Sequence, residues 1–164
     1  MAALCFVGLL AVSFVHFGET LQEAPLRRFA FTPPQGVDDT TSYGTNVAIS
    51  PNGKHIAFIT AGSEGKLWVQ DLDQRQPRAI NGTEGAYDPF WSPDSGFIGF
   101  AAGGELKKVS VQSGLAIRVC ELPGTAFLGG TWSPDGEVIV FASGPRVLYE
   151  VPGRGGTPNL LISR

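Results

Sequence analysis

A short turn signature recurs three times along this chain at nearly constant spacing, and it restricts the possible folds more than any other feature. The serines of the three copies stand 42 and then 41 residues apart. The copies read Ser50-Pro51-Asn52-Gly53, Ser92-Pro93-Asp94-Ser95 and Ser133-Pro134-Asp135-Gly136. Proline fixes φ at about −65°, Asp or Asn bonds to its own backbone, and Gly accepts a positive φ. The signature therefore predicts a tight turn at three equivalent places.

Each turn lies in the same succession of apolar, β-rich stretches, with one stretch before it and three after it. The stretches after the successive turns are 56–58, 67–72 and 78–80, then 97–100, 106–111 and 116–120, then 138–141, 147–151 and 159–162. Four strands in a unit of about 41 residues are typical of a β-propeller blade. We therefore predict an all-β fold, a partial β-propeller of three four-stranded antiparallel blades at about 46–83, 84–123 and 124–164.

An isoleucine and, two residues later, a phenylalanine follow each turn. The pairs are Ile56 and Phe58, Ile98 and Phe100, and Ile139 and Phe141. Alternate residues of a strand point to one face, so each pair should lie where neighbouring blades stack. Trp91 and Trp132 end the strand before their turns and are expected to pack in the same core. Each buried side chain of this kind contributes about 1.5–3 kcal/mol, so each blade should depend on its neighbour.

The composition agrees with many short strands joined by turns. The 164 residues include 22 Gly and 12 Pro, which disfavours a helical protein. With 43% apolar and 16% charged residues, the chain is not expected to be disordered. The chain has only 12 Lys and Arg, which are not clustered, and a pI near 5.3. Nucleic acids are bound largely through basic patches, so we expect no nucleic-acid partner.

The first residues form an uncharged apolar run, AALCFVGLLAVSFVHF, at positions 2–17. Its length falls between the core of a signal peptide, about 7–15 residues, and a membrane-spanning helix of about 20. We expect an N-terminal transmembrane-type helix over 1–17, with an uncleaved signal sequence and a buried core segment as alternatives. Residues 18–45 are expected to form a linker with one short strand at 26–31.

A Trp-Ser-Pro-Asp-Gly turn followed by an Ile-x-Phe strand resembles the repeats of TolB-like, WD-type β-propellers. The match covers about 46–164. The first copy departs from the pattern with Ile49 in place of Trp and Asn52 in place of Asp. The second copy has Ser95-Gly96 where Asp-Gly is expected. All these replacements except Ile49 keep a turn-forming residue.

The order of segments gives a narrower resemblance. An apolar run, a linker with the strand Arg28-Phe29-Ala30-Phe31, and blades containing 82–85 and 104–109 are similar to the C-terminal half of membrane-anchored bacterial serine/threonine protein kinases. That resemblance implies a membrane-anchored protein whose propeller is extracytoplasmic, in the periplasm. The kinase motifs themselves (a Gly-rich loop, His-Arg-Asp and Asp-Phe-Gly) do not occur in these 164 residues, so phosphoryl transfer is not expected of this chain.

No catalytic, cofactor or metal site is expected. Asp94 and Asp135 occupy equivalent turns, so they are interpreted as structural rather than as a catalytic pair. The two His and two Cys have unrelated spacings and do not suggest a zinc site. No Gly-x-Ser-x-Gly elbow marks a hydrolase nucleophile.

The expected function is therefore that of a non-catalytic, protein- or ligand-binding propeller segment, the sensor or scaffold part of a serine/threonine-kinase-like protein. A TolB-like periplasmic scaffold and the gating propeller of a prolyl-oligopeptidase-type hydrolase are the alternatives. The expected partners are the membrane, the remaining blades of a longer protein, and a protein, peptide or small ligand.

Overall fold

Twelve strands and no helix make up the part of the chain that the computed structural model describes, which is residues 47–60, 65–74, 76–124 and 126–163. The fold class that we predicted was therefore wrong in placing a helix before the propeller. Within the described residues no helix is long and apolar enough to cross a membrane. The apolar run at 1–17 and the linker at 18–45 lie outside them.

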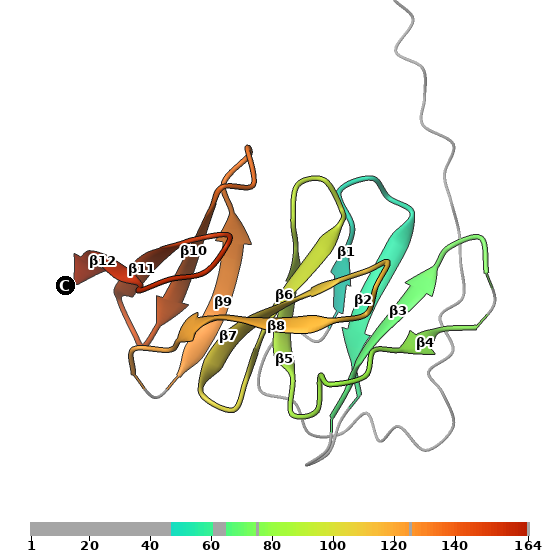
Figure 1. The fold of residues 1–164 in the computed structure, drawn as a ribbon, viewed down its shortest axis with the longest axis horizontal. Helices are drawn as coiled ribbons and strands as arrows, with labels where there is room; N and C mark the ends of the chain where they lie inside the picture. The colour runs from blue at the N-terminus through green and yellow to red at the C-terminus, as the bar shows by residue number, and fades with distance from the viewer. Residues whose placement is uncertain (1–46, 61–64, 75, 125, 164) are drawn as a thin grey trace, which may run out of the picture. The chain divides into compact units, whose positions relative to one another are not determined.

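The strands form three separate four-stranded antiparallel sheets, which we call blades 1 to 3 (Figure 1). Blade 1 consists of β1 (Val47–Ile49), β2 (His55–Ile59), β3 (Leu67–Asp71) and β4 (Arg78–Ala79). Blade 2 consists of β5 (Tyr87–Trp91), β6 (Phe97–Ala102), β7 (Glu105–Ser110) and β8 (Ala116–Glu121). Blade 3 consists of β9 (Phe127–Trp132), β10 (Val138–Ser143), β11 (Val147–Pro152) and β12 (Asn159–Ser163).

Each blade is a simple meander, and the blades follow one another in chain order. Strand order within the sheets is β1-β2-β3-β4, β5-β6-β7-β8 and β9-β10-β11-β12. The first strand of each blade contacts the first strand of the next, β1 with β5 and β5 with β9. This arrangement is that of a propeller, in which successive sheets fan out from a common axis.

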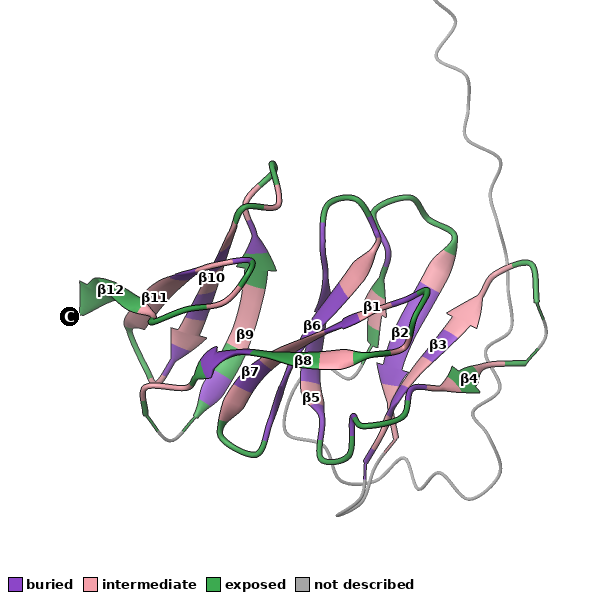
Figure 2. Cartoon of the chain, in the orientation of Figure 1, coloured by how far each residue is buried: buried purple, intermediate pink, exposed green. Residues whose placement is uncertain are grey.

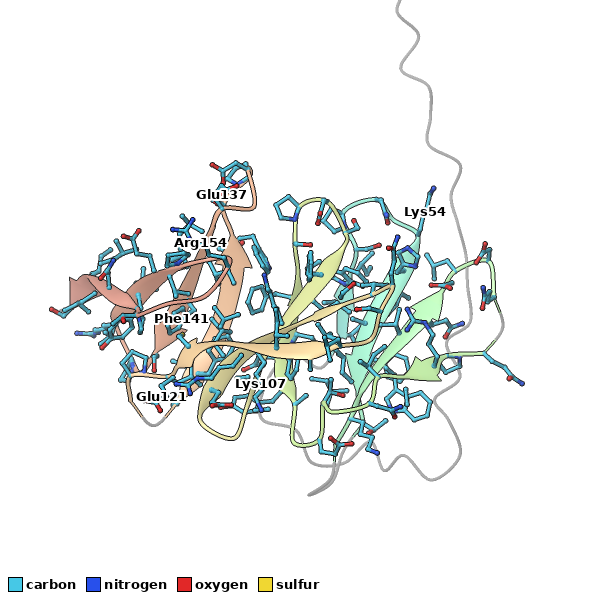
Figure 3. The ribbon with its side chains drawn as sticks, viewed as in Figure 1. Lys54, Lys107, Glu121, Glu137, Phe141 and Arg154 are labelled. Atoms are coloured by element: carbon cyan, nitrogen blue, oxygen red, sulfur yellow. The ribbon has the colours of Figure 1, made fainter. Side chains whose placement is uncertain are left out.

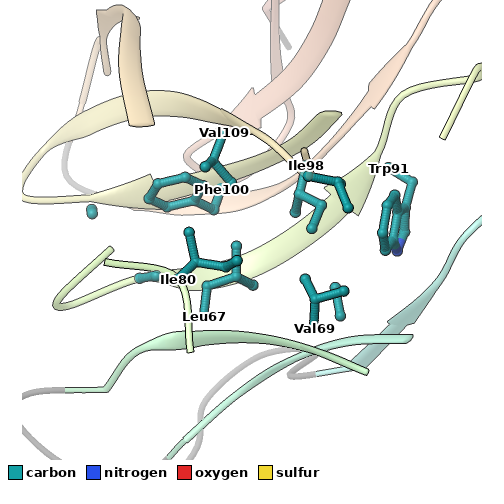
Figure 4. Close-up of a cluster of buried hydrophobic side chains, with 11 residues drawn as sticks. Leu67, Val69, Ile80, Trp91, Ile98, Phe100 and Val109 are labelled. Atoms are coloured by element: carbon teal, nitrogen blue, oxygen red, sulfur yellow. The ribbon is translucent and has the colours of Figure 1, made fainter. Parts of the chain in front are cut away.

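The interface between blades 1 and 2 is an apolar core (Figure 4). Blade 1 contributes alternate residues of its middle strands to this core. Blade 2 contributes the face of its sheet that lies toward blade 1. The buried residues of this core include Ala57, Leu67, Val69, Ile80, Trp91, Ile98, Phe100 and Val109. Ile98 and Phe100 are fully buried here, as the alternation in β6 predicted.

The interface between blades 2 and 3 repeats this packing one blade further on. Its buried residues include Phe90, Ala101, Leu106, Val119, Phe127, Trp132, Ile139, Phe141 and Val151. Gly99 has no room for a side chain, because a Cβ atom there would lie 2.3 Å from Cζ of Phe90. The ring of Phe90 therefore occupies the space that a side chain at position 99 would need.

Blade 3 ends in an exposed strand (Figure 2). All five residues of β12 are exposed, among them Leu160, Leu161 and Ile162 at 55%, 46% and 47%. The side chains of Val138 and Val140 in β10 are only half-buried. The equivalent positions in blade 2 are Phe97 and Gly99, and they lie against blade 3. This face of blade 3 has no neighbouring blade among the described residues.

Candidate functional site

The three signature turns have the same internal hydrogen bonds. In each, the amide at the fourth position donates to the carbonyl oxygen of the serine, at 2.8–2.9 Å. The serine hydroxyl pairs with the side chain of Asn52, Asp94 or Asp135, two residues later. The same hydroxyl accepts the amide at the start of the following strand, at 2.8–2.9 Å. The signature side chains are thus used to build the turn.

The carboxylates of the second and third turns are stabilised in their charged form. The hydroxyl of Ser92 lowers the pKa of Asp94, and the amide of Gly96 adds to the effect. In the same way the hydroxyl of Ser133, followed by the amide of Glu137, lowers the pKa of Asp135. Both groups therefore accept hydrogen bonds as anions and are poor proton donors near neutral pH.

The fourth turn position requires a left-handed backbone. Gly53 and Gly136 adopt φ of 65° and 75°, and Ser95 adopts 61° at the equivalent place. A non-glycine residue in this region is strained. The hydroxyl of Ser95 accepts the amide of Asn52 at 3.2 Å and so joins the turns of blades 1 and 2.

A pocket of about 540 Å³ opens between blades 2 and 3, beside two of the signature turns. We call it the blade 2–3 pocket. Its lining residues are Ser92, Pro93, Asp94, Phe97, Lys108, Trp132, Pro134, Asp135, Gly136, Glu137, Gly153 and Arg154. Figure 3 shows Glu137 on the β9–β10 turn and Arg154 on the β11–β12 connection. The volume falls in the range of about 300–1,000 Å³ that is usual for small-molecule sites.

Lys108 is the central cation of the blade 2–3 pocket. Its Nζ atom donates a hydrogen bond to the carbonyl oxygen of Gly153 at 2.7 Å. The same atom lies 4.9 Å from the ring centroid of Phe97 and 5.8 Å from that of Trp132. Burial lowers the pKa of the Lys108 ammonium. A desolvated ammonium held over two rings is well placed to attract an anionic or polar group.

The position of Lys108 differs in character from blade to blade. Register places Val69 opposite Ala57, Lys108 opposite Gly99 and Glu150 opposite Val140, each partner lying seven residues after its signature serine. Val69 is a buried core residue, whereas Lys108 reaches blade 3 with a charge. The same fold position thus contributes an apolar contact, a cation or an anion.

A second pocket, of about 630 Å³, lies at the equivalent place between blades 1 and 2. Among its lining residues, Nδ1 of His55 lies 2.6 Å from Oδ1 of Asp71. The His55 ring stacks on Trp91 with centroids 5.9 Å apart. Arg78 donates to the carbonyl oxygen of Val111 at 2.6 Å, as Lys108 does to that of Gly153. Each blade interface therefore carries one bond from a cationic side chain to a carbonyl oxygen.

The two signature tryptophans differ in their hydrogen bonding. Nε1 of Trp91 donates to the carbonyl oxygen of Ala48 at 3.0 Å. Nε1 of Trp132 is buried and has no hydrogen-bond partner in the described structure. Both rings are buried between blades, at 8% and 9% exposure.

Cys120 is a buried free cysteine. Burial raises the pKa of Cys120 to about 11, so its thiol is protonated near neutral pH. Among the described residues no group of three or more His, Cys, Asp or Glu side chains could hold a metal ion.

Seven of the twelve residues that line the blade 2–3 pocket belong to the predicted signature. The turns bring Asp94, Asp135 and Trp132 to the blade 2–3 pocket, while Phe58, Phe100 and Phe141 are buried in the blades. Sequence reasoning missed Lys108 and Arg154. The sequence signal for Lys108 is a lysine at the position where blade 1 has Val69, and it can be recognised only when the register of the blades is known.

Comparisons with known proteins identify the fold. No family model and no curated protein matches the chain. The solved TolB structure from Agrobacterium tumefaciens matches 76% of this chain with 21% identity and a TM-score of 0.62, and TolB from Acinetobacter baumannii matches 71% with 22% identity and 0.54. The β-propeller domain of the Trilobed protease from Pyrococcus furiosus matches 74% with 14% identity and 0.59.

The chain spans only part of these proteins. It covers 49% of the Agrobacterium TolB, 32% of the Acinetobacter TolB and 43% of the Trilobed protease domain. The resemblance to kinase-linked propellers finds no support in these matches. Three consecutive four-stranded blades, two of which carry the Trp-Ser-Pro-Asp turn, and the matches to solved TolB structures give this chain a TolB-like β-propeller fold.

Proposed function

We propose that this chain is a binding segment of a β-propeller protein and does not itself catalyse a reaction. The observation that carries the proposal is the blade 2–3 pocket, which has the size of a ligand site and places Lys108 over two aromatic rings. Propellers present loops and blade interfaces as recognition surfaces on a rigid scaffold. A scaffold function agrees with the TolB-like fold.

The polar groups of the signature residues are used in hydrogen bonds within their own turns, which supports the non-catalytic part of the proposal. Asp94 and Asp135 each accept a serine hydroxyl and a backbone amide within their own turn. Cys120 is held as a neutral thiol by burial. These groups are therefore poor candidates for general acid, general base or nucleophile.

The narrower proposal is that the segment is the extracytoplasmic sensor or scaffold part of a serine/threonine-kinase-like protein. It rests on the resemblance of the segment order alone. The open face of blade 3 would then be covered by further blades. Mass spectrometry of the native protein tests this form: peptides of a kinase domain in the same polypeptide support it, and a polypeptide of propeller blades alone supports a TolB-like scaffold instead.

A propeller that gates a hydrolase is the second candidate. The likeness to the propeller domain of the Trilobed protease favours it over other enzymatic roles. Detection of peptides from a protease domain in the native polypeptide, by the same mass spectrometry, would support this candidate.

Site-specific photo-crosslinking tests the binding function directly. A p-benzoylphenylalanine residue replaces Pro134, which is exposed at the edge of the blade 2–3 pocket, or Glu121, which is exposed elsewhere on blade 2. We expect discrete adducts in the producing cell from position 134 and none of the same size from position 121. Equal adducts from both positions, or none from position 134, would contradict a binding function at this pocket.

A further inference from the structure

The blade 2–3 pocket carries unneutralised charges of both signs. Lys108 and Arg154 supply two cations, while Asp94, Asp135 and Glu137 supply three carboxylates. None of these five side chains forms an ion pair within the described structure, where the ion pairs involve other residues. Lys108 uses one of its three ammonium hydrogens, on the carbonyl oxygen of Gly153. Two donors of a desolvated ammonium are thus left for a ligand.

The carboxylates are distributed differently from the cations. Asp94 and Asp135 each direct Oδ1 to their own turn, so their second oxygens remain available. Glu137 follows the third signature turn and is exposed, and its carboxylate has no ion-pair partner among the described residues. The acidic groups therefore all lie in the signature turns or directly after one, whereas Lys108 lies on β7 and Arg154 on the β11–β12 connection.

The space between these charges is partly apolar. Phe97 and Trp132 lie beneath Lys108, and Pro93 and Pro134 belong to the two turns that border the pocket. Aromatic and proline surfaces favour a hydrophobic or aromatic side chain. A purely anionic ligand would be repelled by the three carboxylates, and a purely cationic one by Lys108 and Arg154.

We propose that the blade 2–3 pocket binds a small zwitterion of the amino-acid or short-peptide type that carries an apolar side chain. Its carboxylate contacts Lys108 and Arg154, its ammonium contacts the acidic turns, and its side chain lies against Phe97 and Trp132. This inference rests on the proposed binding function and specifies the chemical class of its ligand.

Four probes with the same ring separate the two charges. Phenylalanine carries both, N-acetylphenylalanine only the carboxylate, phenylalaninamide only the ammonium, and N-acetylphenylalaninamide neither. In amide-resolved NMR titrations of the whole chain, we expect phenylalanine to give saturable shifts at Phe97, Gly136 and Gly153, which line the pocket. We expect at least tenfold weaker binding of each singly charged probe and no saturation with the uncharged one.

Two substitutions assign the charges to residues. Lys108→Met should weaken phenylalanine at least tenfold, because the carboxylate loses its partner, and should not weaken phenylalaninamide, which has no carboxylate. Glu137→Gln should weaken phenylalanine and phenylalaninamide but not N-acetylphenylalanine. Lys107→Met is the matched control, since Lys107 is adjacent on β7 but pairs with Glu105 at 3.2 Å. If Lys108→Met does not fold, the exposed Arg154→Gln replaces it, with a loss again confined to the carboxylate-bearing probes.

The outcomes separate this inference from the broader one. Equal binding of all four probes, shifts outside the pocket, or the same loss with Lys107→Met would overturn the zwitterion assignment. Photo-crosslinks from position 134 would in that case still support a binding function for a ligand of another class. Loss of both the shifts and the crosslinks would overturn the two proposals together.

Discussion

Trp91 in blade 2 donates a hydrogen bond from Nε1 to the carbonyl oxygen of Ala48 in blade 1, at 3.0 Å. Trp132 holds the equivalent position in blade 3, yet its Nε1 is buried without a hydrogen-bond partner in the described structure. Two identical residues at equivalent places in the repeat therefore differ by one hydrogen bond across a blade interface. Substituting each of them separates the contribution of that hydrogen bond to stability from the contribution of the buried ring.

Trp91→Phe should lower the free energy of unfolding by about 1–2 kcal/mol more than Trp132→Phe. Both changes remove a similar ring area, but the first also leaves the carbonyl oxygen of Ala48 without its donor. The second removes a donor that has no partner. Urea unfolding of both variants measures the difference, and equal losses would show that the bond between blades contributes nothing.

Gly99→Ala should destabilise the protein by about 1–3 kcal/mol, because a small-to-large change in a packed core forces its neighbours apart. The new Cβ atom would lie 2.3 Å from Cζ of Phe90. Adding Phe90→Leu should recover part of the loss, so the double variant should be less destabilised than the sum of the two single ones. Thermal or urea unfolding of the four proteins measures this coupling, and strict additivity would contradict the predicted contact.

Gly136→Ala should cost about 1 kcal/mol through the backbone alone. Gly136 has φ of 75°, and no atom lies within 4 Å of the position that a Cβ would take. Gly136→Asn is the matched control, since Asn tolerates the left-handed region and should cost less. Urea unfolding compares the two, and an Asn variant as unstable as the Ala variant would show that the cost does not come from φ.

Ser133→Ala should be most harmful above about pH 4. The hydroxyl of Ser133 lowers the pKa of Asp135 below its usual 3.8, so this stabilisation is present above the unfolded-state pKa. It is lost as the pH falls through the folded-state pKa. The bond from the amide of Val138 to the Ser133 hydroxyl is independent of pH and accounts for the cost that remains in acid.

Urea unfolding at pH 7, 5, 4 and 3 measures this dependence on the carboxylate. The gap between Ser133→Ala and the unsubstituted protein should narrow toward pH 3. Ser113→Ala is a suitable control, because the Ser113 hydroxyl bonds to the amide of Leu115 and to no carboxylate. A gap that stays constant for Ser133→Ala would mean that the turn does not stabilise the Asp135 anion.

The blades themselves were predictable because their signals are local and repeated. The signature turns are built from residues at most five positions apart, and the strands that flank them alternate apolar side chains. The outer strands predicted at 116–120 and 159–162 lie within β8 and β12. Because the pattern occurs three times, the turn can be recognised even where one copy departs from it, as at Ser95, which stands in place of Gly.

The blade 2–3 pocket was not predictable because it is formed between blades. The bond from Lys108 to Gly153 joins residues 45 positions apart, and no local pattern announces it. The left-handed Asp88, with φ of 51°, shifts the register between Tyr87 and Phe90, which strand alternation alone does not foresee. The bond from Lys108 follows from how two sheets meet, and the irregularity at Asp88 lies within one sheet, so the full register of each blade must be known before the pocket can be placed.

The most direct test of the account is the set of nuclear Overhauser effects made by the two signature tryptophans in solution. If the blades stack in chain order, the indole Nε1–H of Trp91 should show a cross-peak to Ala48, and the ring protons of Trp132 should show cross-peaks to the ε-protons of Lys108. Absence of both, with cross-peaks joining the three sheets into one sandwich, would contradict the propeller and the pocket between its blades.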